Sequence, residues 1–266
     1  MYTVKEIVSA IEELAPKELA ESWDNPGLMV GDFDAHVRRV LICLDVTSKN
    51  VEQAVSEGAE LIISHHPLLF KPAKSIIEQT VQGNIIRTLI KNDISVYSAH
   101  TNLDIAAGGT NDALAERLGL INIREFTDDE CVDEYGAPLM KIGRVGQLPE
   151  KMNMLDFTAF VEQAISCESI RFVGDESDII KTVALCTGAG GDGIYSAYNS
   201  GADVYVTSDI RHHEAQLAFE LGLNLVDAGH FETENTICEF MAEYLKERFG
   251  ELIISASLAK PYFRSL

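Results

Sequence analysis

Short apolar runs rich in β-branched residues alternate with amphipathic helical stretches in two separate parts of the chain. Strands that alternate with helices are typical of βαβ units, which build a largely parallel sheet. The chain is therefore predicted to fold as an α/β protein. The expected strands are 40–45, 60–64 and 94–99 in the first part and 183–187, 203–207 and 223–227 in the second, with helices near 47–57, 80–92, 192–200 and 211–221.

The two parts resemble each other residue by residue. Segment 40–64 aligns with segment 183–207 without a gap, and five aligned positions are identical. Identities in the same strand–helix–strand context indicate an internal repeat. We therefore predict two similar α/β halves that arose by duplication, residues 1–125 and residues 126–266.

Residues 126–180 have no counterpart in this repeat. They contain the acidic stretch FTDDECVDEYG, an expected strand pair around LMKIGRVGQL and an expected helix near 155–166. We interpret this segment as a connector that packs on the second half.

The net charge of the chain restricts its partners. The value of −21 comes from 42 acidic and 21 basic residues, and such a field repels the phosphate backbone of nucleic acids and the surface of anionic membranes. Neither partner is expected. A small anionic substrate would need a local positive centre, which a bound cation could supply.

Cysteine usage and hydropathy indicate a cytoplasmic protein. The five cysteines are scattered and form no CxxC pair, which is the usage of a reducing compartment. The N-terminal stretch MYTVKEIVSAIEELAPKEL carries charges throughout, unlike a signal peptide. No apolar run approaches the ~18 residues that are needed to span a bilayer.

Histidines gather where the predicted strands end. Six of the seven lie just beyond such an end, and only His36 lies elsewhere, with no role assigned. In open parallel sheets, ligands bind at the edge formed by the carboxyl ends of the strands. After each third strand a histidine is followed four residues later by an acid: His100 by Asp104, and His230 by Glu234. The other histidines of this group are His65, His66, His212 and His213.

These residue types predict a metal centre. Imidazole and carboxylate are good ligands for borderline divalent metals, here Zn, Fe, Mn or Co. Five ligands exceed the three that one catalytic zinc ion takes from a protein. The pattern therefore predicts two ions about 3.5–4 Å apart, at the carboxyl ends of the strands and between the two halves. The predicted ligands are His65, His66, Asp104, His230 and Glu234.

The adjacent pair His65 and His66 poses a geometric problem, because neighbouring residues of a regular strand point to opposite faces. Pro67 lacks the N–H for a ladder bond and holds His66 in an extended conformation. We therefore expect regular pairing to stop here, so that both rings turn toward one pocket. A histidine pair on a solvated loop is the alternative.

Other polar residues at this edge are candidates for catalysis. His100 is interpreted as an acid–base group or as a residue that orients a metal ligand. Asp209 is a second candidate catalytic group, and together with His212 and His213 it is a candidate to line the same cavity. A simple surface or packing role is the alternative for each of them.

One motif points to a different chemistry. Gly188, Gly190 and Gly193 form a literal GxGxxG between a predicted strand and a predicted helix, with Asp209 about 20 residues later, which is the spacing of a dinucleotide fingerprint. The equivalent loop of the first half, DVTSKN, has no glycine. We therefore prefer a loop whose backbone must approach a ligand or the metal pocket closely.

Several motifs together resemble one known family. ISHHPLLF, SAHTNLD, WDNPGL, GADVYVTSDIRHHE and GHFETE are similar to motifs of the NIF-three-like proteins, which are catalogued as GTP cyclohydrolase 1 type 2 homologs. The resemblance implies two similar α/β domains and a toroidal homohexamer. Longer members carry an inserted domain, so this chain resembles the compact form. The two-metal site of the family corresponds by motif to His65, His66, Asp104, His230 and Glu234.

Two functions from different classes follow as hypotheses. The first is a dinuclear metal-dependent hydrolase that acts on a nucleotide-like or phosphorylated small molecule, with the ring opening of GTP as the reaction that the family label implies. The second is a metal carrier or a ring-shaped assembly protein without turnover. A dinucleotide-dependent oxidoreductase is a third interpretation, which rests on the GxGxxG stretch alone.

Overall fold

The computed structural model describes residues 1–126 and 140–263. By its contacts the chain divides into two compact units. The first is formed by Met1–Gly109 together with Ile237–Lys260, and the second chiefly by Thr110–Thr236. All of the acidic stretch FTDDECVDEYG except Phe126 lies outside the described residues. The chain segment after Ile237, which the repeat assigned to the second half, therefore contacts the first unit.

The first unit is built on a five-stranded sheet. Four neighbouring strands are parallel, and one edge strand, β2, runs antiparallel to β6. The three central strands are those expected from the sequence, while β2 and β13 add the two edges. In spatial order the strands are β13 (Ile253–Ala256), β4 (Arg39–Cys43), β5 (Leu61–Ser64), β6 (Ser95–Ser98) and β2 (Gly27–Val30), and a separate antiparallel pair is formed by β1 (Tyr2–Thr3) and β3 (His36–Val37).

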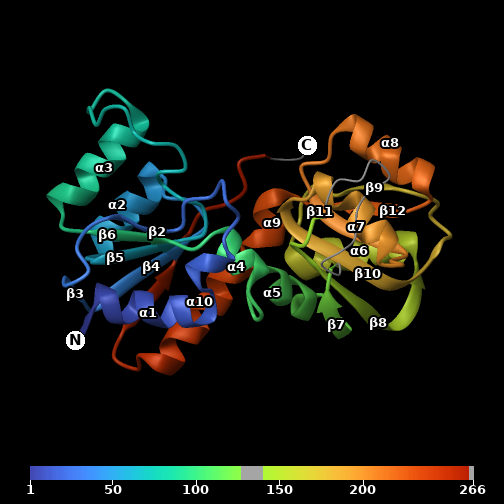
Figure 1. The fold of residues 1–266 in the computed structure, drawn as a ribbon, viewed down its shortest axis with the longest axis horizontal. Coiled ribbons are helices and arrows are strands. Elements are labelled where there is room, and N and C mark those ends of the chain that lie inside the picture. Colours follow the sequence, from blue (N-terminus) through green and yellow to red (C-terminus); the bar gives the residue numbers. More distant parts are fainter. Residues whose placement is uncertain (127–139, 264–266) are drawn as a thin grey trace. The chain divides into compact units, whose positions relative to one another are not determined.

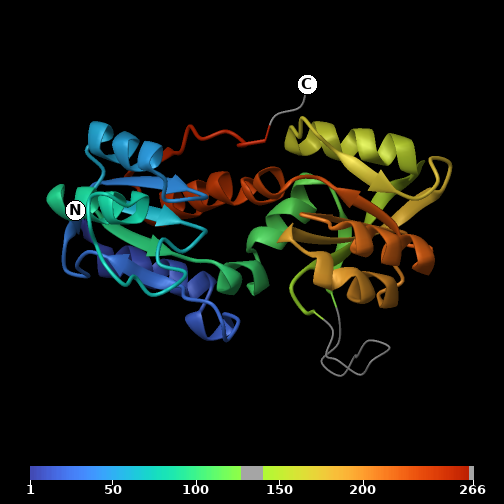
Figure 2. The ribbon, with the colours of Figure 1, turned by 90° about the horizontal axis from the view of Figure 1, so that it is seen from above.

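Helices cover both faces of this sheet (Figure 1). Alternate residues of β4 point to opposite faces, so that Val40 packs with α1 and α10 while Leu41 packs with α2 and α3. Threonine hydroxyls start α1, α2 and α3 by accepting a backbone N–H of the first turn. Figure 2 shows α10 in red, and its residues Ile237, Met241 and Leu245 belong to the core of the first unit. The helices are α1 (Val4–Leu14), η1 (Lys17–Leu19), α2 (Ser48–Glu57), α3 (Val81–Lys91), α4 (Thr101–Ile105) and α10 (Thr236–Arg248).

The second unit has a six-stranded sheet of mixed direction. Only β10, β11 and β12 are mutually parallel, and β7, β8 and β9 are antiparallel to their neighbours. The expected largely parallel arrangement is therefore wrong for this sheet, because the segment before β10 supplies three flanking strands. In spatial order these are β7 (Ile121–Glu125), β8 (Arg144–Asn153), β10 (Ile179–Ala189), β11 (Val204–Ser208), β12 (Asn224–Asp227) and β9 (Arg171–Val173).

Helices again pack on both faces of the second sheet. Val183 and Leu185 contact the side with α5 and α6, and Ala184 and Cys186 contact the side with α7 and α8. The helix expected near 155–166 is α6. The helices are α5 (Thr110–Arg117), α6 (Met154–Ile165), η2 (Gly191–Gly193), α7 (Ile194–Asn199), α8 (His212–Leu221) and α9 (His230–Glu234).

The segments that align in sequence pair in the same register. Val40 lies opposite Leu61 in the first sheet, and the aligned residues Val183 and Val204 lie opposite each other in the second. The two sequence stretches thus form equivalent strand–helix–strand units. Duplication as the origin of this likeness stays a prediction.

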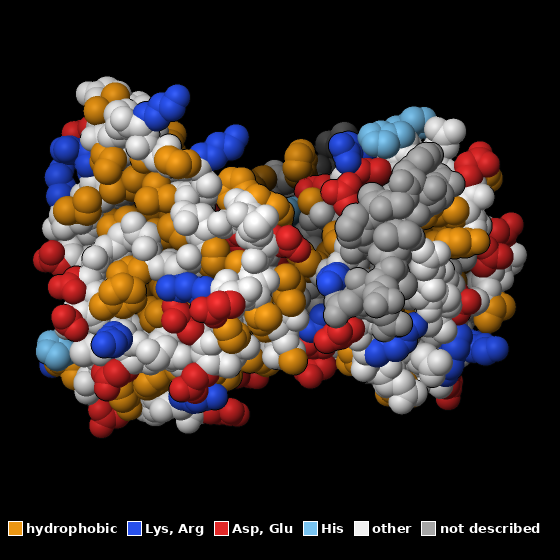
Figure 3. Space-filling view, in the orientation of Figure 1, with side chains coloured by type: hydrophobic (Ala, Val, Ile, Leu, Met, Phe, Trp, Pro, Cys, Tyr) orange, Lys and Arg blue, Asp and Glu red, His pale blue; other side chains and the backbone are white. Residues whose placement is uncertain are grey.

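Acidic side chains are spread over the surface. Asp and Glu side chains are scattered over the face shown in Figure 3 rather than gathered in one patch. Within the described residues, none of the helices combines the length and the hydropathy that a membrane crossing requires. The cysteines of the described part are buried and form no disulfide with one another.

Candidate metal centre

The paired histidines of the first unit lie side by side at the carboxyl end of β5. Their ring centroids are 5.1 Å apart. The strand ends at Ser64, but the backbone N–H groups of His65 and His66 still donate to Cys43 and Leu44. The expected loss of pairing therefore begins only at Pro67. A bond from the Ser64 hydroxyl to the carbonyl of His66 (2.9 Å) tightens the turn that brings the rings together.

His100 joins this pair from the end of β6. Its ring centroid lies 5.1 Å from that of His65 and 5.6 Å from that of His66. One nitrogen from each of the three rings lies within 4.8 Å of the other two, a spacing compatible with a common metal ion. Rings from two separate strand ends thus lie together within this unit.

Asp104 adds a buried carboxylate to the histidine cluster. It lies on the short helix α4, and Oδ1 is 3.5 Å from Nε2 of His65. Two ligand atoms on one tetrahedral ion, each about 2.1 Å from the metal, lie about 3.4 Å apart. The separation of the two side chains thus fits two ligands of one ion.

Each ring has a hydrogen-bond partner that fixes its tautomer. Nδ1 of His65 bonds the carbonyl of Ala99 (2.9 Å), Nδ1 of His66 bonds Asp45 (2.8 Å) and Nδ1 of His100 bonds Asp24 (2.8 Å). A carbonyl or carboxylate oxygen can only accept, so Nδ1 carries the proton of the neutral ring and Nε2 carries the lone pair. This is the arrangement that metal-ligating histidines have in proteins.

Asp24 is a carboxyl beside this cluster with a lowered pKa. Its side chain is fully buried and accepts from His100, from the backbone N–H of Thr101 (3.0 Å) and from the Thr101 hydroxyl (2.6 Å). Burial acts to raise the pKa of Asp24, but the hydrogen bonds from His100 and Thr101 outweigh it and hold the pKa well below its ordinary value. Asp24 is therefore a fixed anion behind the His100 ring.

The second unit has its own cluster at the equivalent edge. His230 and Glu234 lie one turn apart on α9, and Nε2 of His230 is 3.1 Å from Oε2 of Glu234. Nδ1 of His230 bonds Asp209 (2.7 Å), so this ring is held in the same tautomer as those of the first unit. Asp209, expected as a catalytic group, lies against the ring of His230, and its catalytic role stays a prediction.

The glycine-rich loop lies directly against this cluster. Gly188 has φ +66°, and a Cβ there would lie 2.1 Å from Oε1 of Glu234. A Cβ at Gly190 would lie 2.2 Å from the hydroxyl of Thr207. The backbone at Gly188 thus approaches the carboxylate of Glu234 closely, while an approach to a bound ligand stays a prediction. Close packing accounts for both glycines without a dinucleotide.

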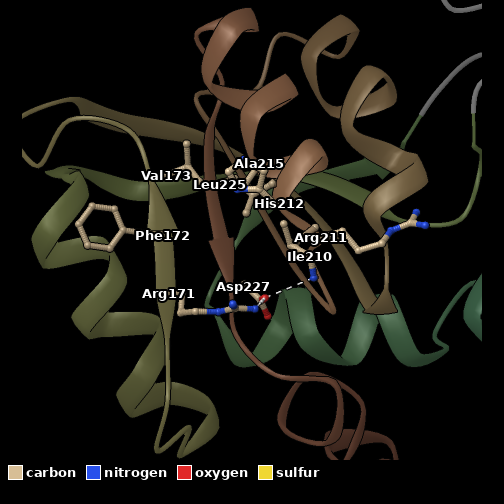
Figure 4. Close-up of a pocket in the computed structure, with 9 residues that line it drawn as sticks. All are labelled: Arg171, Phe172, Val173, Ile210, Arg211, His212, Ala215, Leu225 and Asp227. Carbon is tan, nitrogen blue, oxygen red and sulfur yellow. Dashed lines mark hydrogen bonds and ion pairs between the residues drawn. The ribbon is translucent and has the colours of Figure 1, made fainter.

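A cavity of about 290 Å³ lies elsewhere in the second unit, beside the start of α8 (Figure 4). Arg171 forms an ion pair with Asp227, which also accepts the backbone N–H of Ile210 (3.3 Å). His212 lines this cavity, whereas Asp209 and His213 are not among its lining residues. Of these three residues His212 alone lines this cavity, and the expectation that all three line the metal cavity stays a prediction.

The structure thus forms two clusters, one in each unit. The first contains three of the predicted side chains and His100, and the second contains two of them and Asp209. The carboxylates that hold the rings of His66 and His100 were not found from the sequence. Asp45 ends the predicted strand 40–45, a signal that could have identified it, whereas Asp24 lies on a loop distant in sequence.

Comparisons with known proteins agree with one another. Residues 2–260 match the family described as Duf34/NIF3 (NGG1p interacting factor 3). A protein from Clostridium perfringens (strain 13 / Type A), called GTP cyclohydrolase 1 type 2 homolog, is 38% identical over 97% of this chain and 98% of its own length.

Solved structures have the same fold over nearly the full chain. A Bacillus cereus protein related to NIF3 superimposes with a TM-score of 0.92 and 30% identity, covering 100% of this chain and 99% of that one. Reduced HcgD from Methanocaldococcus jannaschii superimposes with a TM-score of 0.81 and 34% identity, covering 96% and 97% of the two chains.

Proposed function

Because the chain belongs to the Duf34/NIF3 family, as its motifs predicted, we propose that it is a cytoplasmic hydrolase with two divalent metal ions. Its substrate would be a small anion that is nucleotide-like or phosphorylated, and ring opening of GTP is the reaction that the name of its relatives favours. A homohexamer is part of the same proposal.

The fixed tautomers carry this proposal. Three predicted ligand rings, those of His65, His66 and His230, each donate Nδ1–H to an oxygen that can only accept. Surface or packing histidines do not require the same nitrogen to be engaged in every ring, whereas ligands that bind through Nε2 do. The donor set of imidazole and carboxylate fits Zn, Fe, Mn or Co.

We propose that the two clusters form a single centre. His65, His66 and Asp104 would supply three ligands and His230 and Glu234 two, a set that matches two ions better than one. Bound ions would lower the pKa of a coordinated water toward neutrality and polarise the substrate. In an acidic chain, they would also supply the positive charge that an anion needs.

The residues of the chain have separate tasks in this mechanism. His100 accepts a proton at Nε2, since Nδ1–H is held by Asp24. Asp24 stabilises the charged ring that results. Asp45 and Asp209 keep His66 and His230 in the orientation needed for binding.

A second candidate function comes from the description of the family as an interacting factor. The same ligand set in a protein without turnover would act as a metal carrier or as part of an assembly. Metal loading alone does not separate these functions, so the test must measure both loading and turnover.

The deciding experiment measures metal content and hydrolysis together. The parent protein is expected to bind two ions per chain and to hydrolyse GTP or a phosphate ester. His66→Ala and Asp104→Ala should lower kcat/KM at least about 100-fold, because they remove ligands. His36→Ala, an exposed histidine outside both clusters, is the matched control. Full loading with metal, without turnover of any substrate in a broad panel, would favour the metal carrier.

A further inference from the structure

We propose that Trp23 and Phe70 form a stacking surface for a planar heteroaromatic ring of the substrate, beside His100. The inference rests on the proposed function, since it assigns a substrate class to that site. It makes a nucleobase-bearing anion, rather than a simple phosphate ester, the ligand that this chain recognises.

Two exposed aromatic rings stand next to the histidine cluster. The ring centroids of Trp23 and Phe70 are 6.0 Å apart, and they lie 6.2 and 6.3 Å from that of His100. Trp23 is 58% exposed and Phe70 is 45% exposed. A single exposed aromatic side chain is common, but two in contact beside a candidate reactive centre form a surface on which a ring can stack.

Hydrogen bonds hold this surface in place before any ligand binds. The Asn25 side chain donates to the carbonyl of Leu69 (2.7 Å), which ties the Trp23 segment to the Phe70 segment. Glu21 donates its backbone N–H to the hydroxyl of Thr101 (3.0 Å), and buried Asp24 accepts from the same residue. Rings that are already fixed lose little conformational entropy on binding.

The neighbourhood favours an anionic heterocycle. Lys71 and Lys74 follow Phe70 on the same exposed segment, in a chain whose net charge is −21. Their positive charge complements a phosphate attached to a stacked ring. A ring on this surface would also lie next to the His100 ring, where the proposed proton transfer occurs.

A second copy of the chain is the competing occupant of this surface. Two aromatic side chains offer far less area than the roughly 1,200 Å² that a specific interface buries. Their position beside the histidine cluster is explained by a substrate ring and is not required by an interface. The experiment must nevertheless record the oligomeric state.

Trp23 is the only tryptophan of the chain, so tryptophan fluorescence of the zinc-loaded protein, excited where the eight tyrosines do not absorb, reports on this surface. Guanosine 5′-monophosphate is the ring-bearing probe, and ribose 5-phosphate is the matched probe without a ring. The first should change the emission saturably and the second should not. Absence of a saturable response to the nucleotide would overturn the inference.

Variants then test the two rings separately. Trp23→Leu and Phe70→Leu keep apolar volume but remove the ring, and each should weaken nucleotide binding about 5- to 100-fold by calorimetry. Metal content and the affinity for ribose 5-phosphate should not change. Phe33→Leu, an exposed phenylalanine of the same unit, should behave as the parent.

The outcomes separate this inference from the proposed function. If the variants change the oligomeric state but bind the nucleotide as the parent does, the surface is a contact between copies and the inference fails. Equal kcat/KM of parent and variants on a ring-free ester and on GTP would refute the stacking role while the hydrolase stands. Saturable binding at Trp23 without turnover of any substrate would refute the hydrolase alone.

Discussion

The two units place polar side chains at the same edge of similar sheets but hold them in different ways. In the first unit the loop after β4 contributes Asp45, whose carboxylate fixes the ring of His66. In the second unit the aligned position is Gly188, near the carboxyl end of β10, and its missing side chain makes room for Glu234.

This difference shows that one topology can prepare a ligand by two means. A carboxylate fixes the proton on a ring, so its removal changes the chemistry of the ligand. A glycine leaves space for a carboxylate, so replacing the glycine by a larger residue displaces that carboxylate. Substitutions at Asp45 and at Gly188 should therefore weaken metal binding in different ways, the first by changing the tautomer of a ring and the second by displacing a carboxylate.

The largest effect is expected at Gly188. Gly188→Ala puts a Cβ where the carboxylate of Glu234 lies, and this flexible side chain must move away. We expect affinity for Zn²⁺ to fall about 100-fold, comparable with the stronger effects of lost supporting contacts. A left-handed backbone at a residue with a Cβ also costs about 1–2 kcal/mol of folding stability. Metal competition with a chelator and urea unfolding measure the two effects.

Gly201→Ala is the matched control for this substitution. Gly201 also has a positive φ (+76°), but a Cβ there meets nothing within 4 Å. It should lose the same ~1–2 kcal/mol of stability and keep full affinity for the metal. Equal metal loss in both variants would show that the space beside Glu234 has no special role.

The next effect concerns the carboxylates that orient the rings. Asp45→Asn should lower Zn²⁺ affinity about 10- to 100-fold, because an amide no longer imposes Nδ1–H on His66. Asp209→Asn should have a smaller effect, since its side chain is 54% exposed against 37% for Asp45 and water can replace it. The positive φ of Asp209 (57°) is tolerated by Asn, so strain does not obscure the comparison. An effect of Asp209→Asn larger than that of Asp45→Asn would contradict this ranking.

The smallest effect is a difference in how helices begin. In the first unit Thr47 starts α2 with a hydroxyl, whereas in the second unit the buried carboxylate of Glu214 accepts from the backbone N–H (2.7 Å) and the guanidinium of Arg211 at the start of α8. Burial acts to raise the pKa of Glu214, but the bonds from Arg211 outweigh it and lower the pKa.

A carboxyl with a lowered pKa stabilises the fold above its ordinary pKa, and this contribution is lost as the pH falls through the lowered value. Glu214→Gln should therefore be less stable than the parent by about 1 kcal/mol at pH 7. The difference should shrink below about pH 4. Thr47→Ala should cost about 1 kcal/mol at both pH values. Urea unfolding of parent and variants at each pH decides whether the two caps differ in this way.

The sequence predicted the parts of the fold that depend on local pattern. The six expected strands exist, and the parallel core of each unit follows from strands that alternate with helices. The edge strand β13 was missed, because the short run IISA gains its place only by pairing with β4, which is more than two hundred residues earlier. The flanking strands β7 and β9 were also missed, because each is placed by pairing with a later strand, β8 and β12. The second sheet was therefore expected to be more parallel than it is.

For the candidate site as well, the sequence predicted what depends on local pattern but not the long-range contacts. Histidines and acids that follow strands were identified because strand ends meet at one edge. The hydrogen bond from His100 to Asp24 joins residues 76 positions apart, and no local sequence pattern predicts it. The sequence predicted that the glycine-rich stretch approaches a ligand or the metal pocket. It did not predict the contact of Gly188 with Glu234, which depends on how α9 packs.

The path of the chain through the two units has a consequence for biosynthesis. The second unit is essentially one continuous segment, whereas the first lacks α10 and β13 until residues 237–260 have been made. Ile237, Met241 and Leu245 of α10 belong to the core of the first unit, so a nascent chain that ends before them leaves that core open. The unit that is translated first is therefore completed last, and during that interval its exposed apolar face is prone to aggregation.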